Sequence, residues 1–577
     1  MTMNEKQQAQ AWLASDKLPL YLRQQLQEKQ TDEAWLKDAF AGYLAFGTAG
    51  MRGLLEPGTN RINLLTIGRV TAGLARLIQD EGADAMKKGV VISFDSRYHS
   101  SEFATHAAEI LGHAGIKVYL FDSLRPTPEL SFAIRYLHTA AGIMITSSHN
   151  AKIYNGYKIY GADGGQLPPD KASQLVAYAD KIDLLNVPTT RLEVLRAANT
   201  VQMVGEDLDQ AYLKELSTVN IDKAMIKKMA PKLKIIYTPL HGTGKMLYRR
   251  AFAQGGFTQV IPVASQAILD PEFATVDKPN PEFKQVFDRG IALAKENGAN
   301  LIVATDPDAD RVGACVRTED GGFQVLTGNQ MAALMANYLL TKKKEQGQLT
   351  GGEEIITSIV SSSLPFKIAR HYGICTKYVL TGFKYIGQEA DRLEEKPDES
   401  FLMGFEESYG YLFKTFNRDK DAMQGALILM EVAAYYAQRD MTLLDGLHEI
   451  WAKYGAACEI TQAIPIAGFD GKKKMAQILS KLRQEKLTEI NGVQVVRHED
   501  YLEQTWAEGA DSGKLTGFPK SNVLKYFLAD ESWVALRPSG TEPVMKAYVG
   551  TSQPTYEKAQ ALAKSYADFL KKVVAES

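Results

Sequence analysis

The sequence predicts an α/β fold of three consecutive α/β domains with mixed or parallel sheets, followed by a smaller C-terminal α+β domain. Apolar runs of strand length alternate with helical patterns, an order that is typical of largely parallel sheets. This alternation restarts twice along the chain, and the tail then changes to short strands with two helices. At 577 residues the chain is also too long for one hydrophobic core. We place the domains at residues 1–205, 206–322, 323–455 and 456–577.

The first domain begins with a helical segment. A glycine-rich loop, FGTAGMRG, follows it and contains Arg52. The strands VVISF and AGIMI come next, and the second ends in the polar segment TSSHN (146–150). Strand ends in α/β sheets are where catalytic loops lie, so a serine hydroxyl there could be a nucleophile. A helix cap or a turn is the structural alternative, because Ser and Asn favour both.

The second domain contains the segment NLIVATDPDADR, in which Asp306, Asp308 and Asp310 alternate directly after an apolar strand. Three carboxylates this close repel one another unless a cation lies among them, and magnesium suits such oxygen ligands. A calcium EF-hand is excluded, because its glycine and glutamate positions hold Arg311 and Arg317. A phosphotransferase of the haloacid-dehalogenase type, with Asp306 as the nucleophile, stays open, and so does a solvated acidic turn.

The third domain contains EIITSIVSSS, TGFKYIG and GFEESYG. Lys384 lies between two glycines, where it could hold a phosphate or move a proton, or could simply occupy a surface turn. Glu406 and Glu407 precede Ser408 at a strand end, where carboxylates could accept hydrogen bonds from the hydroxyls of a sugar. An acidic helix start is the alternative. The polar segment at 341–354 predicts a surface loop.

The fourth domain carries RPSGTEP, which has the components of a phosphate site. Arg537 offers a planar fork of donors, and Ser539 and Thr541 offer hydroxyls. Gly540 lets backbone N–H groups approach an anion closely. A plain Pro-Ser-Gly turn is the structural alternative.

Composition excludes several classes of function. Lys plus Arg number 66 and Asp plus Glu number 68, so the chain has neither a basic field for nucleic acid nor a polybasic membrane patch. Cys315, Cys375 and Cys458 are too scattered for a disulfide framework or a zinc site. The N-terminus lacks the apolar core of a signal peptide, and no apolar run reaches bilayer length. We expect a cytoplasmic protein, monomer or dimer, that binds a small molecule.

The segments TSSHN, DPDADR, GFEES and RPSGTEP occur in this order at wide intervals, and together they resemble the α-D-phosphohexomutase superfamily. The resemblance covers nearly the whole chain. GTAGMRG and the chain length are most similar to the branch of bacterial α-phosphoglucomutases and the phosphoglucomutase-2/phosphopentomutase group. The resemblance implies four domains around a central cleft, each of which supplies one loop.

The resemblance also implies roles for the residues of these loops. Ser148 would carry the phosphoryl group, and Ser147 would be the small residue before it. An oxygen of phosphorylated Ser148 would join the three aspartates around Mg²⁺. The other implied assignments are Glu406 and Ser408 for sugar hydroxyls, Arg537, Ser539, Gly540 and Thr541 for the phosphate that is not transferred, and Lys384, His149, Arg52 and Arg311 for the reaction centre. Ala151 stands where many relatives have proline, which leaves the serine assignment unchanged.

The implied activity is that of a phosphoglucomutase, which converts glucose 1-phosphate to glucose 6-phosphate through a phosphoserine and a glucose 1,6-bisphosphate intermediate that also acts as activator. Phosphopentomutase and phosphomannomutase activities are the alternatives. The loop letters GFEES differ from the GEQS-like pattern of glucosamine phosphate mutases. Lys384 and His149 are both candidate proton acceptors, and we favour Lys384. A catalytically inactive sugar-phosphate-binding protein is disfavoured, because every expected loop is chemically intact.

Overall fold

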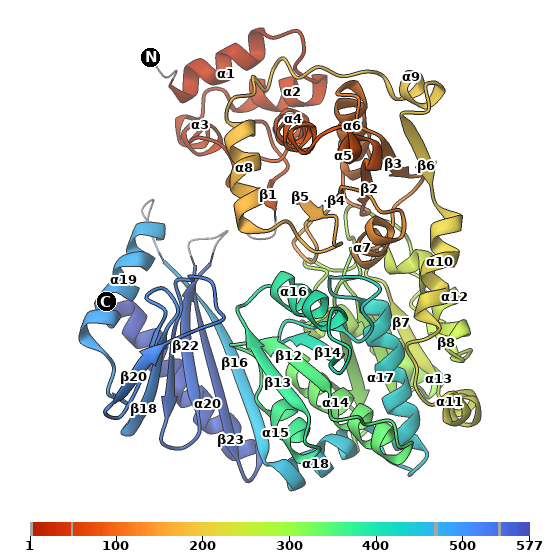
Figure 1. Ribbon diagram of the computed structural model, residues 1–577, viewed down its shortest axis with the longest axis vertical. Helices are drawn as coiled ribbons and strands as arrows, with labels where there is room; N and C mark the ends of the chain where they lie inside the picture. The colour runs from red at the N-terminus through yellow and green to blue at the C-terminus, as the bar shows by residue number, and fades with distance from the viewer. Residues whose placement is uncertain (1–3, 48–49, 467–470, 540–543, 577) are drawn as a thin grey trace. The chain divides into compact units, whose positions relative to one another are not determined.

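The structure is a computed structural model that describes residues 4–47, 50–466, 471–539 and 544–576. The chain divides into two units. Figure 1 labels helices and strands of both. Unit 1 comprises Met1–Val325 and Gly410–Glu431, and unit 2 comprises Leu326–Tyr409 and Val432–Ser577.

Unit 1 contains two mixed sheets and the helices around them. Its strands are β1 (Met51–Leu54), β2 (Val90–Phe94), β3 (Val118–Phe121), β4 (Ala141–Ile145), β5 (Tyr154–Gly161), β6 (Val201–Val204), β7 (Ile235–Thr238), β8 (Val260–Pro262), β9 (Leu301–Thr305), β10 (Val312–Arg317), β11 (Phe323–Val325) and β15 (Gly410–Leu412). Its α-helices are α1 (Glu5–Ala14), α2 (Leu20–Lys29), α3 (Glu33–Ala39), α4 (Leu64–Glu81), α5 (Ala83–Lys88), α6 (Ser100–His113), α7 (Thr127–Tyr136), α8 (Pro169–Ala179), α9 (Leu192–Ala197), α10 (Glu206–Leu216), α11 (Lys223–Met229), α12 (Gly244–Gln254), α13 (Asp288–Asn297) and the greater part of α17 (Ala422–Ala437). Two short 3₁₀ helices, η1 (Ala230–Lys232) and η2 (Lys284–Phe287), complete it.

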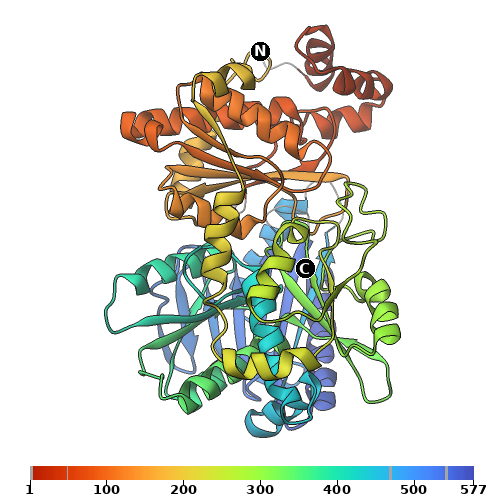
Figure 2. The same ribbon diagram turned by 90° about the vertical axis from the view of Figure 1, so that its right-hand side faces the viewer.

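The first sheet of unit 1 has the strand order β1-β5-β4-β2-β3-β6. Strands β4, β2, β3 and β6 are parallel, and β5 and β1 add antiparallel strands at one edge. Alternate residues of β2 face opposite sides, since Val90 and Ile92 pack with α6 whereas Val91 packs with α7. Figure 2 shows helices above and below this sheet. The segments that follow β2 and β4 therefore leave the sheet at the same edge.

The second sheet of unit 1 has the order β11-β10-β9-β7-β8, in which β9, β7 and β8 are parallel. Strand β9 is fully buried, as its unbroken apolar sequence predicts. It ends at Thr305, so Asp306 is the first residue beyond the sheet. The strand end thus fixes where the acidic loop begins.

Unit 2 contains a parallel sheet and a larger antiparallel sheet. Its strands are β12 (Glu353–Ser358), β13 (Cys375–Val379), β14 (Ser400–Glu406), β16 (Ala456–Pro465), β17 (Glu489–Ile490), β18 (Val493–Asp500), β19 (Thr505–Glu508), β20 (Asp511–Lys514), β21 (Leu524–Leu528), β22 (Trp533–Pro538) and β23 (Val544–Gln553). Its helices are α14 (Gly328–Glu345), α15 (Leu364–His371), α16 (Phe383–Glu394), α18 (Leu443–Tyr454), α19 (Gly471–Glu485) and α20 (Tyr556–Glu576).

Strands β13, β12 and β14 pair in parallel, so their carboxyl ends meet at one edge. The C-terminal sheet is antiparallel, with the order β16-β23-β22-β21-β18-β19-β20 and β17 paired to β18. One face of this sheet packs with α19 and α20, and Leu524 and Tyr526 of β21 lie on that side. Phe527 faces the other side, together with Trp533 and Ile359. The alternation along β21 thus separates two apolar clusters.

These sheets confirm the predicted fold class of three α/β parts followed by a smaller β-rich part. The placement of the three boundaries between the four domains stays a prediction. Among the described residues, none of the helices has both the length and the apolar character needed to cross a bilayer.

The structure corrects the predicted surface loop at 341–354. Helix α14 continues to Glu345, and strand β12 already begins at Glu353. Lys342, Lys343 and Lys344 form the last turn of α14, where cations interact favourably with the negative end of the helix dipole. The polar letters therefore indicate an exposed helix end there, and only the residues between the two elements form a loop.

Candidate functional site

The TSSHN segment follows β4 in unit 1 and holds Ser148 in an unusual backbone conformation. Ser148 has φ 51°, in the left-handed region that is costly for residues other than glycine. Its amide donates a hydrogen bond to Thr146 Oγ1 at 2.8 Å, and Thr146 Oγ1 donates to Asp95 Oδ2 at 2.7 Å. The hydroxyl of Ser147 is buried and has no hydrogen-bond partner among the described residues. Of the two serines, the geometry favours Ser148 as the reactive one.

The Ser148 hydroxyl donates to Asp306 Oδ2 at 2.7 Å and lies 3.1 Å from His149 Nδ1. It therefore has a carboxylate on one side and a group that can exchange a proton on the other. Only 2% of Ser148 is exposed. A small ligand must therefore bind directly against this hydroxyl to react with it.

Arg97 holds the backbone of the TSSHN segment. It lies in the loop after β2, two residues beyond Asp95. Its guanidinium is fully buried, donates to Asp95 Oδ2 at 3.1 Å and stacks on the ring of Phe273 at 4.9 Å. Its other donors reach backbone carbonyls on the chain that leads from the serine to β5. These acceptors are the carbonyls of Ser148, Asn150, Ala151 and Tyr154.

Asp306, Asp308 and Asp310 are buried, and one oxygen from each lies within 4.8 Å of the others. Asp306 Oδ1 accepts from the amides of Asp310 and Arg311 at 3.1 Å and 2.9 Å. Among the described residues, Asp308 Oδ1 and Asp310 Oδ1 have no hydrogen-bond partner. Buried carboxylate oxygens without donors are costly, and they are the ligands that a hard divalent cation takes. The predicted acidic cluster is therefore present as a candidate metal centre.

The charges around this cluster are unevenly balanced. Burial raises the pKa of Asp306 well above its usual value, and the neighbouring charges of Asp308 and Asp310 raise it further. Burial would also raise the pKa of Asp308, but the ammonium of Lys158 holds that pKa below its usual value. A divalent cation would supply the positive charge that Asp306 lacks.

Two lysines that the sequence did not single out contact the acidic cluster. Lys158 Nζ lies 2.8 Å from Asp308 Oδ2 and 3.3 Å from Asp310 Oδ2. Lys420 Nζ lies 3.1 Å from Asp310 Oδ2. Thr127 Oγ1 also donates to Asp308 Oδ2 at 2.9 Å. Lys158 could have been found, because it is a lone charge in the apolar strand letters YKIY, and buried charges are usually paired. Lys420 lies among other polar residues, in NRDKD, so the sequence did not indicate that it is buried.

The two predicted arginines lie at the edge of this group. Arg52 Nη1 is 3.5 Å from Asn150 Oδ1, and Arg311 Nε is 3.8 Å from Asp310 Oδ1. Unit 1 therefore brings together seven of the predicted site residues: Arg52, Ser148, His149, Asp306, Asp308, Asp310 and Arg311.

The predicted sugar residues lie at the carboxyl edge of the parallel sheet of unit 2. Glu406 ends β14 and accepts from the amide of Gly382 at 2.8 Å. Lys384 belongs to the first turn of α16 and is buried there with Phe383 and Ile386, so the structural alternative of a surface turn is wrong. Burial lowers the pKa of Lys384. Ser408 is half-buried beside them.

Glu407 is held by hydroxyls that sequence reasoning did not assign. Ser358 Oγ and Ser361 Oγ donate to Glu407 Oε2 at 3.2 Å and 3.0 Å. The run of serines after β12 was the available signal, but serines at a strand end have too many structural uses to point to one partner.

The predicted phosphate residues lie where β22 ends in unit 2. Arg537 Nη2 donates to Tyr548 OH at 3.4 Å, whereas Arg537 Nε is buried without a hydrogen-bond partner in the described part of the chain. The amide of Ser539 donates to the carbonyl of Val544 at 2.8 Å. Gly540 and Thr541 lie outside the described residues. A buried guanidinium N–H without an acceptor suits an anionic ligand.

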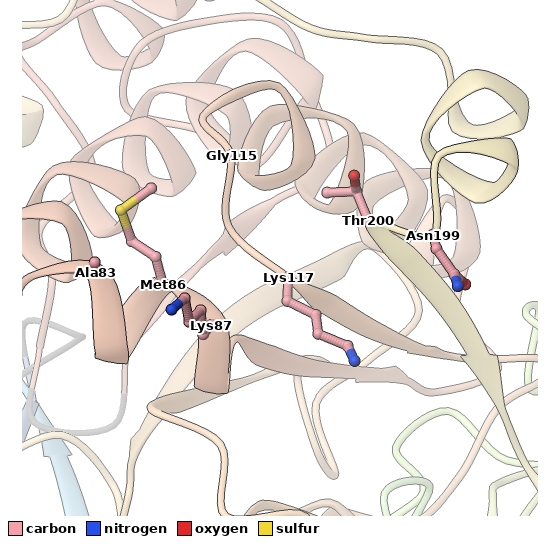
Figure 3. A pocket seen from close by; sticks show the side chains of 7 residues that line it. All are labelled: Ala83, Met86, Lys87, Gly115, Lys117, Asn199 and Thr200. Atoms are coloured by element: carbon pink, nitrogen blue, oxygen red, sulfur yellow. The ribbon is translucent and has the colours of Figure 1, made fainter.

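A surface hollow of about 530 Å³ lies elsewhere in unit 1, and Figure 3 shows its lining side chains. Lys117 and Thr200 immediately precede β3 and β6, so the hollow lies at the amino ends of the parallel strands. Ser148 follows the carboxyl end of β4, the end at which α/β sheets bind ligands. The hollow contains none of the predicted site residues, and Ser148 lies at the opposite edge of this sheet.

Comparison with known families gives three matches along the chain. They are phosphoglucomutase/phosphomannomutase alpha/beta/alpha domain I at residues 43–186, domain II at 210–321 and domain III at 327–454. The phosphoglucomutase of Staphylococcus epidermidis is 38% identical over 514 residues, which are 88% of this chain and 91% of the relative.

Solved structures agree on the fold. A phosphoglucomutase/phosphomannomutase family protein from Burkholderia thailandensis matches 92% of this chain and 97% of its own, with a TM-score of 0.63 and 18% identity. The open form of the exocytosis-sensitive phosphoprotein parafusin, a phosphoglucomutase from Paramecium, matches 93% of this chain and 95% of its own, with a TM-score of 0.66 and 18% identity.

Proposed function

This chain belongs to the phosphoglucomutase/phosphomannomutase family of the α-D-phosphohexomutase superfamily, and we propose that it interconverts glucose 1-phosphate and glucose 6-phosphate through a phosphoserine at Ser148. The observation that carries this proposal is the Ser148 hydroxyl, 2.7 Å from an aspartate of a buried acidic cluster. The choice of glucose as the sugar rests on the curated relatives, which are phosphoglucomutases and match over most of the chain.

Phosphorylation of Ser148 would change the electrostatics of this site. The serine would lose the proton that it now donates to Asp306 and would gain nearly two negative charges at neutral pH. Those charges would then face three buried carboxylates. Only additional positive charge makes this arrangement stable, and Arg311 already supplies one charge that acts on Asp306.

The residues present fit a magnesium ion. Asp306, Asp308 and Asp310 would hold it, since Asp308 Oδ1 and Asp310 Oδ1 have no hydrogen-bond partner among the described residues. Lys158 and Lys420 contact other oxygens of the cluster, so they fix its carboxylates and leave these two oxygens available. When bound, the ion would neutralise charge on the phosphoserine and on the group being transferred.

In the proposed reaction, the bond between Ser148 Oγ and phosphorus breaks as O6 of glucose 1-phosphate forms a bond to phosphorus. The product, glucose 1,6-bisphosphate, turns over in the site, and Ser148 Oγ then takes the phosphoryl group from O1. Glucose 6-phosphate leaves. The transition state of such a transfer is loose, so the protein contributes mainly position and charge. Added glucose 1,6-bisphosphate acts as activator because it rephosphorylates Ser148.

Each transfer also moves one proton. The attacking hydroxyl loses a proton, and the departing serine oxygen gains one. His149 Nδ1 lies 3.1 Å from Ser148 Oγ and is placed to exchange the proton of the serine. We assign the proton of the sugar hydroxyl to Lys384, because burial lowers its pKa and so favours the neutral amine that a base requires. Arg52 and Arg311 neutralise charge at the phosphoryl group.

Unit 2 supplies the groups for binding the substrate. Glu406 would accept hydrogen bonds from sugar hydroxyls, and the Ser408 hydroxyl would donate to them or accept from them. Arg537 with Ser539, Gly540 and Thr541 would bind the phosphate that is not transferred. The Arg537 N–H that has no hydrogen-bond partner among the described residues supports this role. A guanidinium fork with hydroxyls tolerates both orientations of the intermediate, because it recognises a phosphate and not one sugar carbon.

We place this activity in the cytoplasm, where the free thiols Cys315, Cys375 and Cys458 would stay reduced.

The rival in which Asp306 is the phosphorylated group fits the geometry less well. Both of its oxygens are already engaged, one by Ser148 and the other by two backbone amides. A nucleophilic carboxylate needs an oxygen directed at the substrate. The family match also favours the serine.

A coupled dehydrogenase assay for glucose 6-phosphate tests the proposal, with magnesium and a trace of glucose 1,6-bisphosphate present. Mannose 1-phosphate and ribose 1-phosphate are assayed beside it, with detection suited to each product. We expect glucose 1-phosphate to be converted with a higher kcat/KM than mannose 1-phosphate or ribose 1-phosphate, and Ser148→Ala to abolish the reaction. A preference for ribose 1-phosphate would make the chain a phosphopentomutase, and a preference for mannose 1-phosphate a phosphomannomutase.

A further inference from the structure

Residues 358–363, SIVSSS, begin at the last residue of β12 and have no role in the proposed reaction; we call this segment the serine loop. Its hydroxyls nevertheless contact the sugar-binding segment. Ser358 Oγ and Ser361 Oγ donate to Glu407 Oε2 at 3.2 Å and 3.0 Å, and the Glu407 amide donates back to Ser361 Oγ at 3.2 Å. The serine loop thus holds both the side chain and the backbone of the residue between Glu406 and Ser408.

Lys525 of the C-terminal sheet contacts the backbone of the same loop. Its ammonium donates to the carbonyl of Ile359 at 2.6 Å, and only 3% of the residue is exposed. Three aromatic rings surround the cation, those of Tyr378, Phe527 and Trp533, at 5.1, 4.8 and 4.5 Å from the nitrogen to the ring centres. A buried lysine is costly, so this arrangement requires the attraction of the ring faces and the carbonyl to hold the charge.

The apolar residues of the serine loop are anchored to the same face of the C-terminal sheet. Ile359 and Val360 are buried in a cluster with Trp533 and Tyr548. Tyr548 OH also accepts from Arg537, the predicted phosphate ligand. The loop that holds Glu407 and the arginine that would hold the phosphate therefore share one packed cluster.

We propose that Lys525 is a positioning residue for substrate binding: through the carbonyl of Ile359 it fixes the serine loop, and the serine loop orients Glu406, Glu407 and Ser408. This inference rests on the proposed function, because it concerns how the sugar-binding segment of that site is held. It assigns to a buried cation in the C-terminal sheet a role in sugar binding without contact to the sugar.

The charged and titratable groups near Lys525 set its pH behaviour. Burial lowers the pKa of Lys525 to about 8, and Glu499, which lies opposite it on β18, partly offsets this. Tyr378 stays neutral, because burial raises its pKa to about 12. Glu459 reaches the serine loop through Ser362, and burial raises its pKa to about 7. Above pH 7.5 Glu459 is therefore mostly ionised, and Lys525 is the group near the loop that changes charge.

The test compares Lys525→Met with Ser361→Ala in the full-length protein, and Lys564→Met is the matched control on the exposed side of α20. Methionine keeps the length and the contacts with the rings but removes the donor and the charge. We expect Lys525→Met to raise KM for glucose 1-phosphate about tenfold, the effect of losing one charge-assisted hydrogen bond, with kcat within about threefold. Ser361→Ala should do the same, and Lys564→Met should change neither constant.

Two further measurements separate positioning from a general loss of stability. Hydrogen–deuterium exchange should become faster in peptides that cover residues 403–410 in both Lys525→Met and Ser361→Ala, while peptides from β2 and β9 stay unchanged. The double variant should raise KM no more than the larger single effect, because both changes break the same chain of contacts. The ratio of KM for Lys525→Met to KM for the wild type should fall between pH 7.5 and 9.5, as the wild-type lysine loses its own charge.

Unchanged KM and unchanged exchange at 403–410 in folded Lys525→Met would overturn the proposal, and so would fully multiplicative effects in the double variant. If Lys525→Met does not fold, Ser361→Ala and the pH dependence of the wild-type KM decide in the same way. The wild-type assay separates this result from the proposed function, because turnover of glucose 1-phosphate by the wild type establishes the function whatever the variants show.

Discussion

Arg97→Lys should disable the TSSHN segment of unit 1 without unfolding the chain. Arg97 makes five side-chain hydrogen bonds, four to backbone carbonyls and one to Asp95. A lysine ammonium has three donors, so at least two of these buried acceptors lose their partner. Each such loss costs about 1–3 kcal/mol, or roughly 2–6 kcal/mol together.

This cost exceeds the strain that the bonds now oppose. Ser148 has φ 51°, a conformation that costs about 1–2 kcal/mol for a residue other than glycine. We therefore expect the TSSHN segment to relax and Ser148 to leave its place beside Asp306. If about 3 kcal/mol of the loss is expressed at the reacting oxygen, phosphoryl transfer slows roughly 10²-fold.

The assay is transfer of the phosphoryl group from glucose 1,6-bisphosphate to the protein, followed by intact-mass spectrometry. Arg76→Lys is the matched control, because Arg76 is an exposed arginine of α4. Circular dichroism and the thermal unfolding midpoint report whether the fold is kept. Transfer at the wild-type rate in folded Arg97→Lys would refute the view that these carbonyl contacts hold Ser148 in its reactive position.

Three further predictions concern the acidic cluster and the proton acceptor. Lys158→Met removes the cation nearest Asp308, so the free energy of unfolding in chelator should fall by about 3–5 kcal/mol. Added magnesium should stabilise this variant more than it stabilises the wild type, and equal magnesium effects in both proteins would contradict this. Asp308→Asn should lower turnover about 10²–10³-fold at saturating magnesium with an unchanged circular dichroism spectrum, and near-normal turnover without magnesium would rule out the assigned metal loop. Because burial lowers the pKa of Lys384, its neutral form appears at lower pH than in an ordinary lysine, so turnover should rise with pH through that pKa. Lys384→Met should remove this rise and cost about 10²–10⁴-fold, whereas a rise that only His149→Asn removes would assign the proton to His149.

Much of the site could be predicted from the sequence because its residues follow strands. An apolar run that ends in alternating aspartates fixes both the strand and the loop after it, as β9 and Asp306 illustrate. Glu406 likewise follows from the end of β14. Within one sheet, parallel strands such as β2 and β4 bring their ends to one edge, so local patterns specify which loops of that sheet lie together.

The supporting residues could not be predicted in the same way, because their roles depend on partners far along the chain. Lys158 and Asp308 are 150 residues apart, and Lys525 and Ile359 are 166 apart. A lysine in a strand shows only that some partner must exist if the strand is buried. The prediction for the end of α14 was wrong for a different reason. Lys342 and its neighbours are polar residues typical of a loop, but the helix dipole stabilises them in the last turn of the helix.

The central claim is tested most directly by locating the phosphoryl group. The protein is incubated with glucose 1,6-bisphosphate and magnesium, digested, and mapped by mass spectrometry before and after hydroxylamine treatment. We predict a single phosphate on Ser148 that survives hydroxylamine and is transferred to glucose 1-phosphate when that sugar is added. A phosphate on Asp306 that hydroxylamine removes, or no phosphate on a folded protein, would contradict the account.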